Sequence, residues 1–382
     1  MNKLETPTPY WRLSGFYLFY FASLGALLPY WSVYLKSLSF SPREIGELMA
    51  ILMATKIVSP NIWAWIADHT GKRMMIVRLG SLLSVLAFTG ILLGSSYWWI
   101  ALVMVTFSFF WNATLPQFEA NTFTYLGEHS HRYSSIRLWG SIGFVVAAVA
   151  LGSVLEQYGT GQLPIILVGL FASIWLMSLL VPERAAAHMS LEHEPLITVL
   201  KRPEVFSLII VVFLMQASHG PYYTFYTIYM EDHHYERSLV GQLWALGVIA
   251  EVIVFLFMYK IVPRFGLRFM LISSLILAAV RWLLIGWFVD YIVVMIIAQL
   301  LHAATFGIYH AAAIQLFNKY FTGRHQGRGQ ALYSSMSFGL GGAVGALISG
   351  YTWETVGAGI SFTIAAGLSV IAGFVAWRYI KN

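Results

Sequence analysis

The chain has 382 residues, of which 58% are hydrophobic and only 10% are charged, with a formal net charge of +6. Its mean hydropathy is +0.70. A soluble domain carries about 25% charged residues, so this composition excludes a soluble enzyme and indicates an integral membrane protein. The chain contains no cysteine, which excludes disulfides, a thiolate nucleophile and a cysteine metal site.

Twelve apolar stretches follow one another along the chain, and each has about the 20 residues that a helix needs to cross a bilayer. They cover approximately residues 10–35, 43–66, 74–95, 97–123, 133–156, 162–181, 204–230, 238–260, 268–288, 291–317, 327–351 and 357–379. The first stretch is too long for a signal peptide. We therefore predict an all-α integral membrane fold of twelve transmembrane helices in two pseudo-symmetric six-helix bundles.

The widest polar gap between these stretches is 182–203. It predicts three parts: an N-terminal six-helix bundle over 1–181, a cytoplasmic linker over 182–203 and a C-terminal six-helix bundle over 204–382. Two such halves are a recurrent design of secondary transporters.

Lysine and arginine positions predict the orientation of the chain, because cytoplasmic loops are enriched in both. Most of the 23 lie in the termini and in the connections on the same side as the termini. Only Lys36, Arg43 and Arg237 lie on the opposite side. We therefore expect a multi-pass protein of the cell inner membrane with both termini in the cytoplasm. The positive net charge follows from this topology and does not indicate a nucleic-acid partner.

The connection between the second and third stretches reads AWIADHTGKR over 64–73. It resembles the loop signature of the major facilitator superfamily, Gly-x-x-x-Asp-Arg-x-Gly-Arg-Arg, with departures at Ala64 and His69. The resemblance implies a cytoplasmic gate formed by Asp68, Gly71, Lys72 and Arg73. A basic turn with a helix cap is the alternative interpretation of the same residues.

Three consecutive stretches of the second half each carry one ionisable residue in mid-span, namely Glu251, Arg281 and His302. A charge near the bilayer centre costs about 2.5–3.5 kcal/mol on insertion scales. These three side chains therefore need a shared polar cavity, where Glu251 and His302 can exchange a proton and Arg281 can hold a negative charge.

The first half carries Lys56, Glu119 and Arg137 inside its spans, with Asn112 on the same helical face as Glu119. Glu119 and Arg137 are close enough along the chain to form an ion pair. Counting both halves, three buried cations face only two carboxylates. Because an unpaired buried cation is costly, this excess favours an anionic ligand.

Further polar side chains repeat at helical spacing in the second half. Gln216, His219 and Tyr223 precede or flank Gly220-Pro221, where proline should break or kink the helix. Broken helices in membranes line cavities. Gln299 and Tyr309 share a stripe with His302, and Trp244 shares one with Glu251. Helix packing is the alternative for each of them.

Longer strings carry a second resemblance, to the phenylpropionate permease family. They are LPYWSVYLK at 28–36, RLWGS at 137–141, WALGVIAEVI at 244–253, VRW at 280–282 and QLLH at 299–302. In addition, Glu251, Arg281 and His302 look like the proton-coupling set of the lactose permease family, and Glu119 and Arg137 look like its sugar-contacting pair. This chain departs from that family in having Gln299, Thr305 and Lys56.

These resemblances imply a proton-coupled symporter, not an enzyme, which imports an aromatic carboxylate such as 3-phenylpropionate by alternating access. The predicted substrate-binding residues are Lys56, Asn112, Glu119, Arg137, Gln216, His219, Tyr223, Trp244, Gln299 and Tyr309. The proton is the coupling ion, and no cofactor, metal or obligate protein partner is expected beside the small-molecule substrate and the lipid bilayer. A sugar or nucleoside proton symporter, and an efflux antiporter of drugs or metabolites, remain alternatives.

Overall fold

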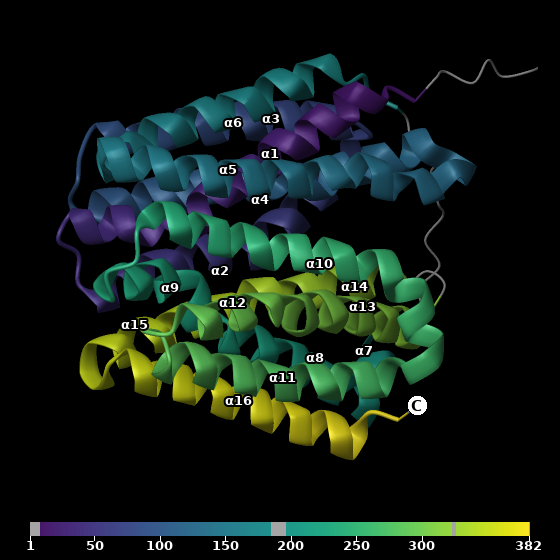
Figure 1. Cartoon of the computed structure of the whole chain (residues 1–382). Coiled ribbons are helices and arrows are strands. Elements are labelled where there is room, and N and C mark those ends of the chain that lie inside the picture. The colour runs from purple at the N-terminus through teal and green to yellow at the C-terminus, as the bar shows by residue number, and fades with distance from the viewer. Residues whose placement is uncertain (1–7, 185–195, 323–325, 382) are drawn as a thin grey trace, which may run out of the picture. The chain divides into compact units, whose positions relative to one another are not determined.

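The computed structural model describes residues 8–184, 196–322 and 326–381, and every regular element within these ranges is a helix. In this part of the chain, 12 helices or runs of joined helices are long and apolar enough to cross a membrane, which confirms the predicted fold class. Figure 1 follows them along the chain. Helices suit this environment because each satisfies its own backbone hydrogen bonds in lipid.

The first six spans are α1 (Tyr10–Ser37), α2 (Pro42–Thr70), α3 (Arg73–Thr89) with its extension η1 (Gly90–Leu92), α4 (Tyr97–Leu126), α5 (Tyr133–Tyr158) and α6 (Leu163–Leu180). The short turns η2 (Gly127–Arg132) and η3 (Thr160–Gln162) flank α5. The predicted linker contains the short helix α7 (Leu196–Leu200), while its residues 185–195 lie outside the described residues.

The last six spans contain more interruptions. They are α8 (Pro203–Ser218) with α9 (Gly220–Asp232), α10 (Arg237–Phe265), α11 (Leu267–Trp287), α12 (Ile292–Leu300) with η4 (Ala303–Ile308) and α13 (Tyr309–Tyr320), α14 (Gln326–Ser334) with η6 (Ser335–Gly341) and α15 (Gly342–Val356), and α16 (Ala358–Tyr379).

The described chain forms two compact units. Unit 1 contains residues 8–27, 58–147 and 162–184, and unit 2 contains the rest of the described residues. Helices α1, α2 and α5 therefore each run from one unit into the other. The division into halves at 1–181 and 204–382 follows the order of the chain, and it stays a prediction.

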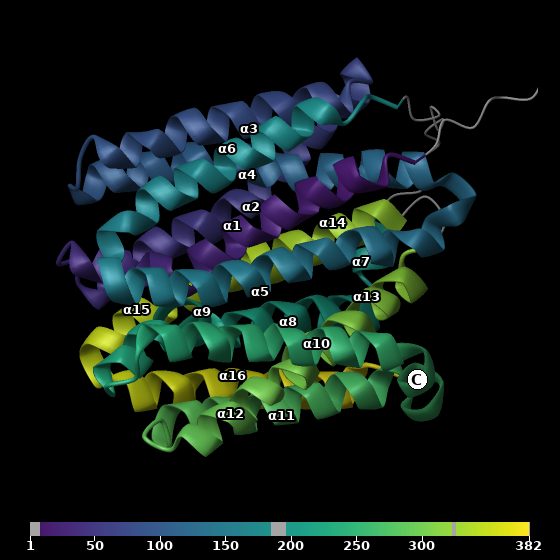
Figure 2. The ribbon, with the colours of Figure 1, turned by 45° about the horizontal axis from the view of Figure 1, so that its top comes forward.

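Each unit packs its own helices around an apolar interior. In unit 1, α3 lies against α4 and α6, with Phe88, Phe107 and Phe171 buried together. In unit 2, α16 packs along α11 and α8, and α11 and α16 lie side by side in both Figure 1 and Figure 2. Near the start of α2, Gly46 meets Gly350 of α15 so closely that a Cβ on Gly46 would lie 2.7 Å from the Gly350 Cα.

Three interruptions shape the helices of unit 2. The predicted break at Gly220-Pro221 is confirmed, because α8 ends at Ser218 and α9 begins at Gly220 with proline in its first turn. The sequence did not reveal the other two, η4 and η6, which are wide π-helical turns. Such turns concentrate at functional sites, and η4 follows directly after His302.

Candidate functional site: a buried Arg281–His302–Glu251 chain

Arg281 of α11 is completely buried, and its guanidinium is held by neutral acceptors. Its Nε donates to the Ala298 carbonyl at 2.8 Å, one terminal nitrogen donates to Thr305 Oγ1 at 3.1 Å, and the other lies 3.4 Å from Gln299 Oε1. Its Cζ also lies 4.3 Å from the ring centre of Tyr222. The acceptors come from α12 and η4, so one short stretch of chain surrounds the charge.

His302 connects Arg281 to Glu251. Its Nδ1 lies 3.1 Å from a terminal nitrogen of Arg281. Because arginine has no acceptor, Nδ1 must accept this bond, and the neutral imidazole then carries its proton on Nε2. That Nε2 faces Glu251 Oε2 at 3.6 Å. The predicted proton-coupling residues are therefore adjacent, with His302 in the middle and Arg281 one step removed from Glu251.

Aromatic rings enclose this chain. Tyr222 donates to Gln299 Oε1 at 2.9 Å and packs against Trp244 at 4.5 Å between ring centres. Trp244 donates to Thr227 Oγ1 and Trp282 donates to Ser218 Oγ. The polar atoms of Tyr222, Trp244 and Trp282 are thus hydrogen-bonded, and the apolar parts of their rings surround Arg281 and His302. Tyr222, Trp282 and Thr305 were missed as site residues, although Tyr222 is the neighbour of the predicted Tyr223.

His219 lies at the break between α8 and α9 and is 1% exposed. Its Nδ1 bonds the Met215 carbonyl at 2.8 Å, so Nδ1 is the donor and Nε2 is left as an acceptor. This Nε2 has no hydrogen-bond partner, and neither has the Nε2 of the buried Gln299. The ring of His219 stacks on Tyr223, and Gln216 is buried one turn earlier. Both atoms are buried, and each would gain a hydrogen bond from a ligand or a water molecule that reached it.

The remaining predicted residues of unit 2 have different surroundings. Tyr309 is buried, and its hydroxyl lies 3.5 Å from the Val212 carbonyl, which is a packing role. Lys56 has its Nζ 3.6 Å from Met53 Sδ.

In unit 1, Glu119 and Arg137 do not form the ion pair that their spacing allowed. Glu119 instead accepts a 2.8 Å hydrogen bond from Tyr133. Arg137 lies over the ring of Phe21, with its Cζ 3.6 Å from the ring centre. Asn112 is buried on the same helix as Glu119. A cation on an aromatic face keeps its charge available to a further anion.

One property is common to Lys56, Arg137 and Arg281. Within the described residues, none of the three has a carboxylate oxygen within 4.0 Å, whereas the Lys and Arg residues at several helix ends do. Within the described residues, each of these three cations is therefore without a direct carboxylate contact, which agrees with the excess of cations counted in the sequence.

The predicted gate residues form a tight turn. Gly71 has φ +67°, a conformation that favours glycine and lets α2 end and α3 begin after two residues. This turn brings Arg73 to 3.0 Å from Asp68, and Arg73 also lies 3.4 Å from Gln117 Oε1. Lys72 occupies the position before α3. The Asp68 side chain is 64% exposed, so this ion pair can open without leaving a buried charge.

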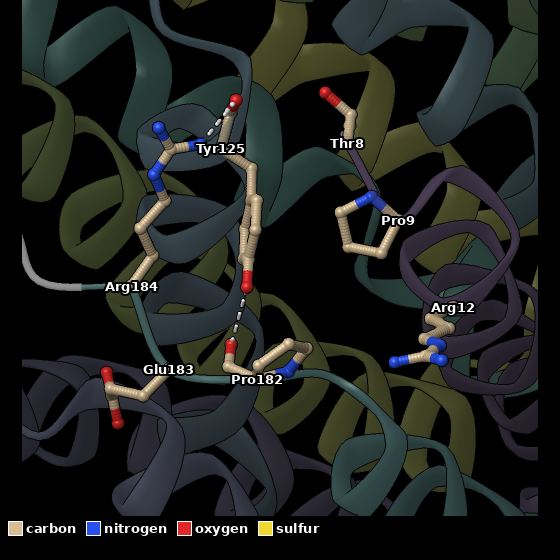
Figure 3. Close-up of a pocket in the computed structure, with 7 residues that line it drawn as sticks. All are labelled: Thr8, Pro9, Arg12, Tyr125, Pro182, Glu183 and Arg184. Atoms are coloured by element: carbon tan, nitrogen blue, oxygen red, sulfur yellow. Dashed lines mark hydrogen bonds between the residues drawn. The ribbon is translucent and has the colours of Figure 1, made fainter. Parts of the chain in front are cut away.

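A surface cavity of unit 1, about 510 Å³ in volume, is lined by none of the predicted site residues. Figure 3 shows its lining, in which Arg184 bonds the Tyr125 carbonyl and the Tyr125 hydroxyl bonds the Pro182 carbonyl. The other lining residues are Thr8, Pro9, Arg12 and Glu183. This cavity does not identify the candidate functional site. The site is assigned from the charged side chains within the spans and from the buried polar atoms that lack a hydrogen-bond partner.

Known proteins resemble this chain over nearly its full length. The MFS_1 like family matches residues 10–364. The probable 3-phenylpropionic acid transporter of Escherichia coli (strain K12) is 29% identical over 369 residues, covering 93% of this chain and 94% of that protein. The maltose permease of Geobacillus stearothermophilus is 23% identical, covering 89% of this chain and 86% of that protein.

Two solved structures share the fold at low sequence identity. The nucleoside transporter NupG aligns with a TM-score of 0.80 at 18% identity, covering 98% of this chain and 99% of that chain. The POT family transporter PepTSo aligns with a TM-score of 0.76 at 12% identity, covering 99% of this chain and 98% of that chain. The relatives are transporters and not enzymes, which confirms the resemblances seen in the sequence. This chain belongs to the MFS_1 like family and is a multi-pass membrane transporter of the major facilitator fold.

Proposed function

We propose that this transporter imports a small aromatic carboxylate together with protons, by alternating access across the inner membrane. The observation that carries the proposal is the set of three intramembrane cations, Lys56, Arg137 and Arg281, without a carboxylate within 4.0 Å among the described residues. An anionic substrate would supply the missing charge, since an unpaired buried cation is costly. The name of the Escherichia coli relative supports an aromatic acid such as 3-phenylpropionate.

The cations have different roles in this proposal. Arg281 is saturated by Ala298, His302, Thr305 and Gln299, so it stays with the proton site. Lys56, near the thioether of Met53, and Arg137, over the ring of Phe21, have no such set of oxygen acceptors, so one or the other is left for the substrate carboxylate. The aromatic rings and the open Nε2 atoms of His219 and Gln299 would contact the rest of the substrate.

The Arg281–His302–Glu251 chain supports proton coupling at Glu251. With Nδ1 accepting from Arg281, the Nε2–H of His302 faces Glu251 Oε2 at 3.6 Å, just beyond hydrogen-bond distance, and would donate to the ionised carboxylate on a slightly closer approach. The contact with His302 favours the ionised form of Glu251. Protonation neutralises this carboxylate and so removes one negative charge from the site. Arg281 thus acts on Glu251 by fixing the tautomer of His302. The contact between His302 and Glu251 would in turn respond to the charge of a substrate anion bound nearby.

Uptake of radiolabelled 3-phenylpropionate into proteoliposomes tests the proposal. With an imposed gradient, acidic outside, we expect accumulation that a protonophore abolishes, and little accumulation of a sugar or a nucleoside. If the gradient drives uptake of maltose or uridine but not of 3-phenylpropionate, the protein is a sugar or nucleoside symporter and the proposed substrate is wrong. Release driven by an inward proton gradient would indicate efflux.

Replacement of Asp68 by asparagine should slow turnover more than it weakens binding. Asp68 lies in a helix-end turn and contacts Arg73, not a predicted substrate residue, so its charge acts on the equilibrium between conformations. An exposed ion pair is worth about 0.2–1 kcal/mol. We therefore expect a severalfold loss in the counterflow rate with binding nearly unchanged. Lys260→Gln, at an exposed position on α10, is the control, and an equal loss of binding and counterflow in Asp68→Asn would contradict a gate.

A further inference from the structure

Two histidines of unit 2 have the same phenylalanine ring between them along the helix. The ring of Phe306 is nearly parallel to the imidazole of His302, with the ring centres 5.3 Å apart and an angle of 9° between the planes. It is also parallel to the imidazole of His310, at 5.8 Å and 2°. Phe306 therefore separates the proton site from a second titratable ring, which has no part in the Arg281–His302–Glu251 chain.

The wide turn η4 produces this row of rings. Side chains four residues apart step round a regular α-helix by about 40°, because 3.6 residues make one turn. The π-helical turn η4 takes more residues for each turn, since its hydrogen bonds reach the fifth residue, and so it reduces this step. Positions 302, 306 and 310 thereby follow one line along the helix, whereas a regular helix would turn His310 away from His302.

His310 is hydrogen-bonded to a buried phenol. Its Nδ1 lies 2.7 Å from the hydroxyl of Tyr333, which belongs to α14 and is 3% exposed. A phenolic hydroxyl can both donate and accept a hydrogen bond. Tyr333 can therefore donate to this nitrogen when the imidazole is neutral there and accept from it when the ring is protonated. The His310–Tyr333 pair remains hydrogen-bonded in either protonation state, which suits a histidine that gains and loses a proton.

The carboxyl group of the proton site packs against the same wide turn. A Cβ placed on Gly307 would lie 3.1 Å from the Cγ of Glu251, so only a glycine lets α10 approach η4 this closely. Glu251 Oε2 also lies 3.6 Å from His302 Nε2. The Glu251 side chain thus lies beside the turn that carries Phe306 and leads to His310.

We propose that Phe306 is an apolar barrier on the path of the coupled proton. Beyond this barrier, the His310–Tyr333 pair is the exit group and receives the proton that Glu251 releases. His310 then passes a proton to water and returns to its neutral form, so each cycle moves one proton and leaves the pair unchanged. In the orientation predicted from the lysines and arginines, α13 runs towards the cytoplasm. At eight residues along the helix, His310 then lies roughly 12 Å further inward than His302. This inference rests on the proton coupling of the proposed function.

The surroundings of Phe306 suit a barrier. A phenyl ring has no atom that can accept or pass on a proton, and a symporter must prevent protons from crossing without substrate. Phe338 of η6 packs against both Phe306 and His310, with ring centres 6.2 and 6.0 Å apart. The imidazole of His219 meets the same phenyl ring nearly edge-on at 6.5 Å. Transfer from Glu251 to His310 therefore requires Phe306 to move, which makes proton release depend on a change in the shape of the site.

Proton influx into proteoliposomes without substrate tests the barrier, with a pH-sensitive dye inside the vesicles and an acid jump outside. In Phe306→Ala, water can enter the space of the ring, because the imidazoles on both sides supply its polar partners. We expect influx roughly tenfold faster than in the parent, which corresponds to a barrier lowered by about 1.4 kcal/mol. Phe338→Ala is the matched control, since this ring packs on the same residues without lying between the imidazoles, and its influx should match the parent.

A second substitution separates a path through His310 from a general loosening of the helices. In the Phe306→Ala, His310→Phe double variant, influx should return to the parent level, because the exit group is absent and an apolar ring is present. A leak that persists in the double variant would overturn the role of His310, and the absence of a leak in Phe306→Ala would overturn the barrier. If Phe306→Ala does not fold, Phe306→Gln must leak more than Phe306→Leu, and equal influx in these two variants would overturn the barrier as well.

The exit role has its own measurement in variants that retain Phe306. His310→Gln should slow gradient-driven uptake of 3-phenylpropionate roughly tenfold, a change of about 1.4 kcal/mol in the barrier, while counterflow, which needs no release of the proton, stays at the parent rate. Tyr333→Phe should slow the same uptake less, because His310 is still present. A His310→Gln variant that loses uptake and counterflow equally would show a purely structural role and overturn the exit.

These outcomes are separable from those of the proposed function, because the leak is measured without substrate. If the parent does not accumulate 3-phenylpropionate but Phe306→Ala leaks through His310, the proposed substrate is wrong and the barrier is supported. If the parent accumulates the acid with protons but Phe306→Ala does not leak, the barrier alone is wrong.

Discussion

Glu251→Gln should retain substrate binding and exchange but lose accumulation driven by a pH gradient. Glutamine resembles the protonated carboxyl in size and lacks the charge, so the variant would behave as a transporter whose proton never leaves. His302 Nε2 lies 3.6 Å from Glu251, and the amide oxygen can still face it, so the local packing survives. We expect at least a tenfold loss of gradient-driven accumulation in proteoliposomes, with counterflow within about threefold of the parent, a difference of less than 1 kcal/mol.

A matched control keeps this result specific to Glu251. Glu119 is the other glutamate that the sequence analysis counted among the interior charges, and it accepts a hydrogen bond from Tyr133 in unit 1. If Glu119→Gln abolishes accumulation and Glu251→Gln does not, the proton runs through Glu119 and the role of the Arg281–His302–Glu251 chain is wrong. If both variants lose binding as well as accumulation, the substitutions act on the substrate site and not on coupling.

Lys56→Ala should weaken the binding of 3-phenylpropionate much more than the binding of its neutral amide. Lys56 lies within α2 with no carboxylate within 4.0 Å among the described residues, so the substrate carboxylate would be its charge partner. A hydrogen bond to a charged group contributes about 1.5–3 kcal/mol, which corresponds to roughly a 10- to 100-fold loss of affinity. Binding of 3-phenylpropionate and 3-phenylpropionamide, measured by calorimetry on the purified protein, gives the comparison.

The amide separates a charge effect from a packing effect. Affinity for 3-phenylpropionamide should change less than about threefold in Lys56→Ala, because the amide offers no charge to the lysine. Equal losses for both compounds would show that Lys56 supports the shape of the site only. Arg137→Ala tested in the same way identifies the alternative cation, since Arg137 is also without a carboxylate and lies over Phe21.

Much of the fold followed from the sequence alone. Apolar stretches of the length of a bilayer span predicted the helices, because a polypeptide in lipid must satisfy its hydrogen bonds locally. Gly220-Pro221 predicted the division between α8 and α9, since proline removes a backbone donor. The single ionisable residues at 251, 281 and 302 predicted a shared polar site, because charges in the apolar part of a membrane are costly.

The tertiary structure decided which of these groups meet. Glu119 and Arg137 were close along the chain but took Tyr133 and Phe21 as neighbours, because the rotation of each helix sets the direction of its side chains. The tautomer of His302 follows from its contact with Arg281, 21 residues away, and no local pattern predicted the wide turn η4 that begins directly after His302. The backbone N–H of Arg43 donates to the carboxylate of Glu354 across 311 positions. Periodicity and composition report which face of a helix is apolar, whereas pairings of this kind depend on how separate helices pack, and only the folded chain contains that information.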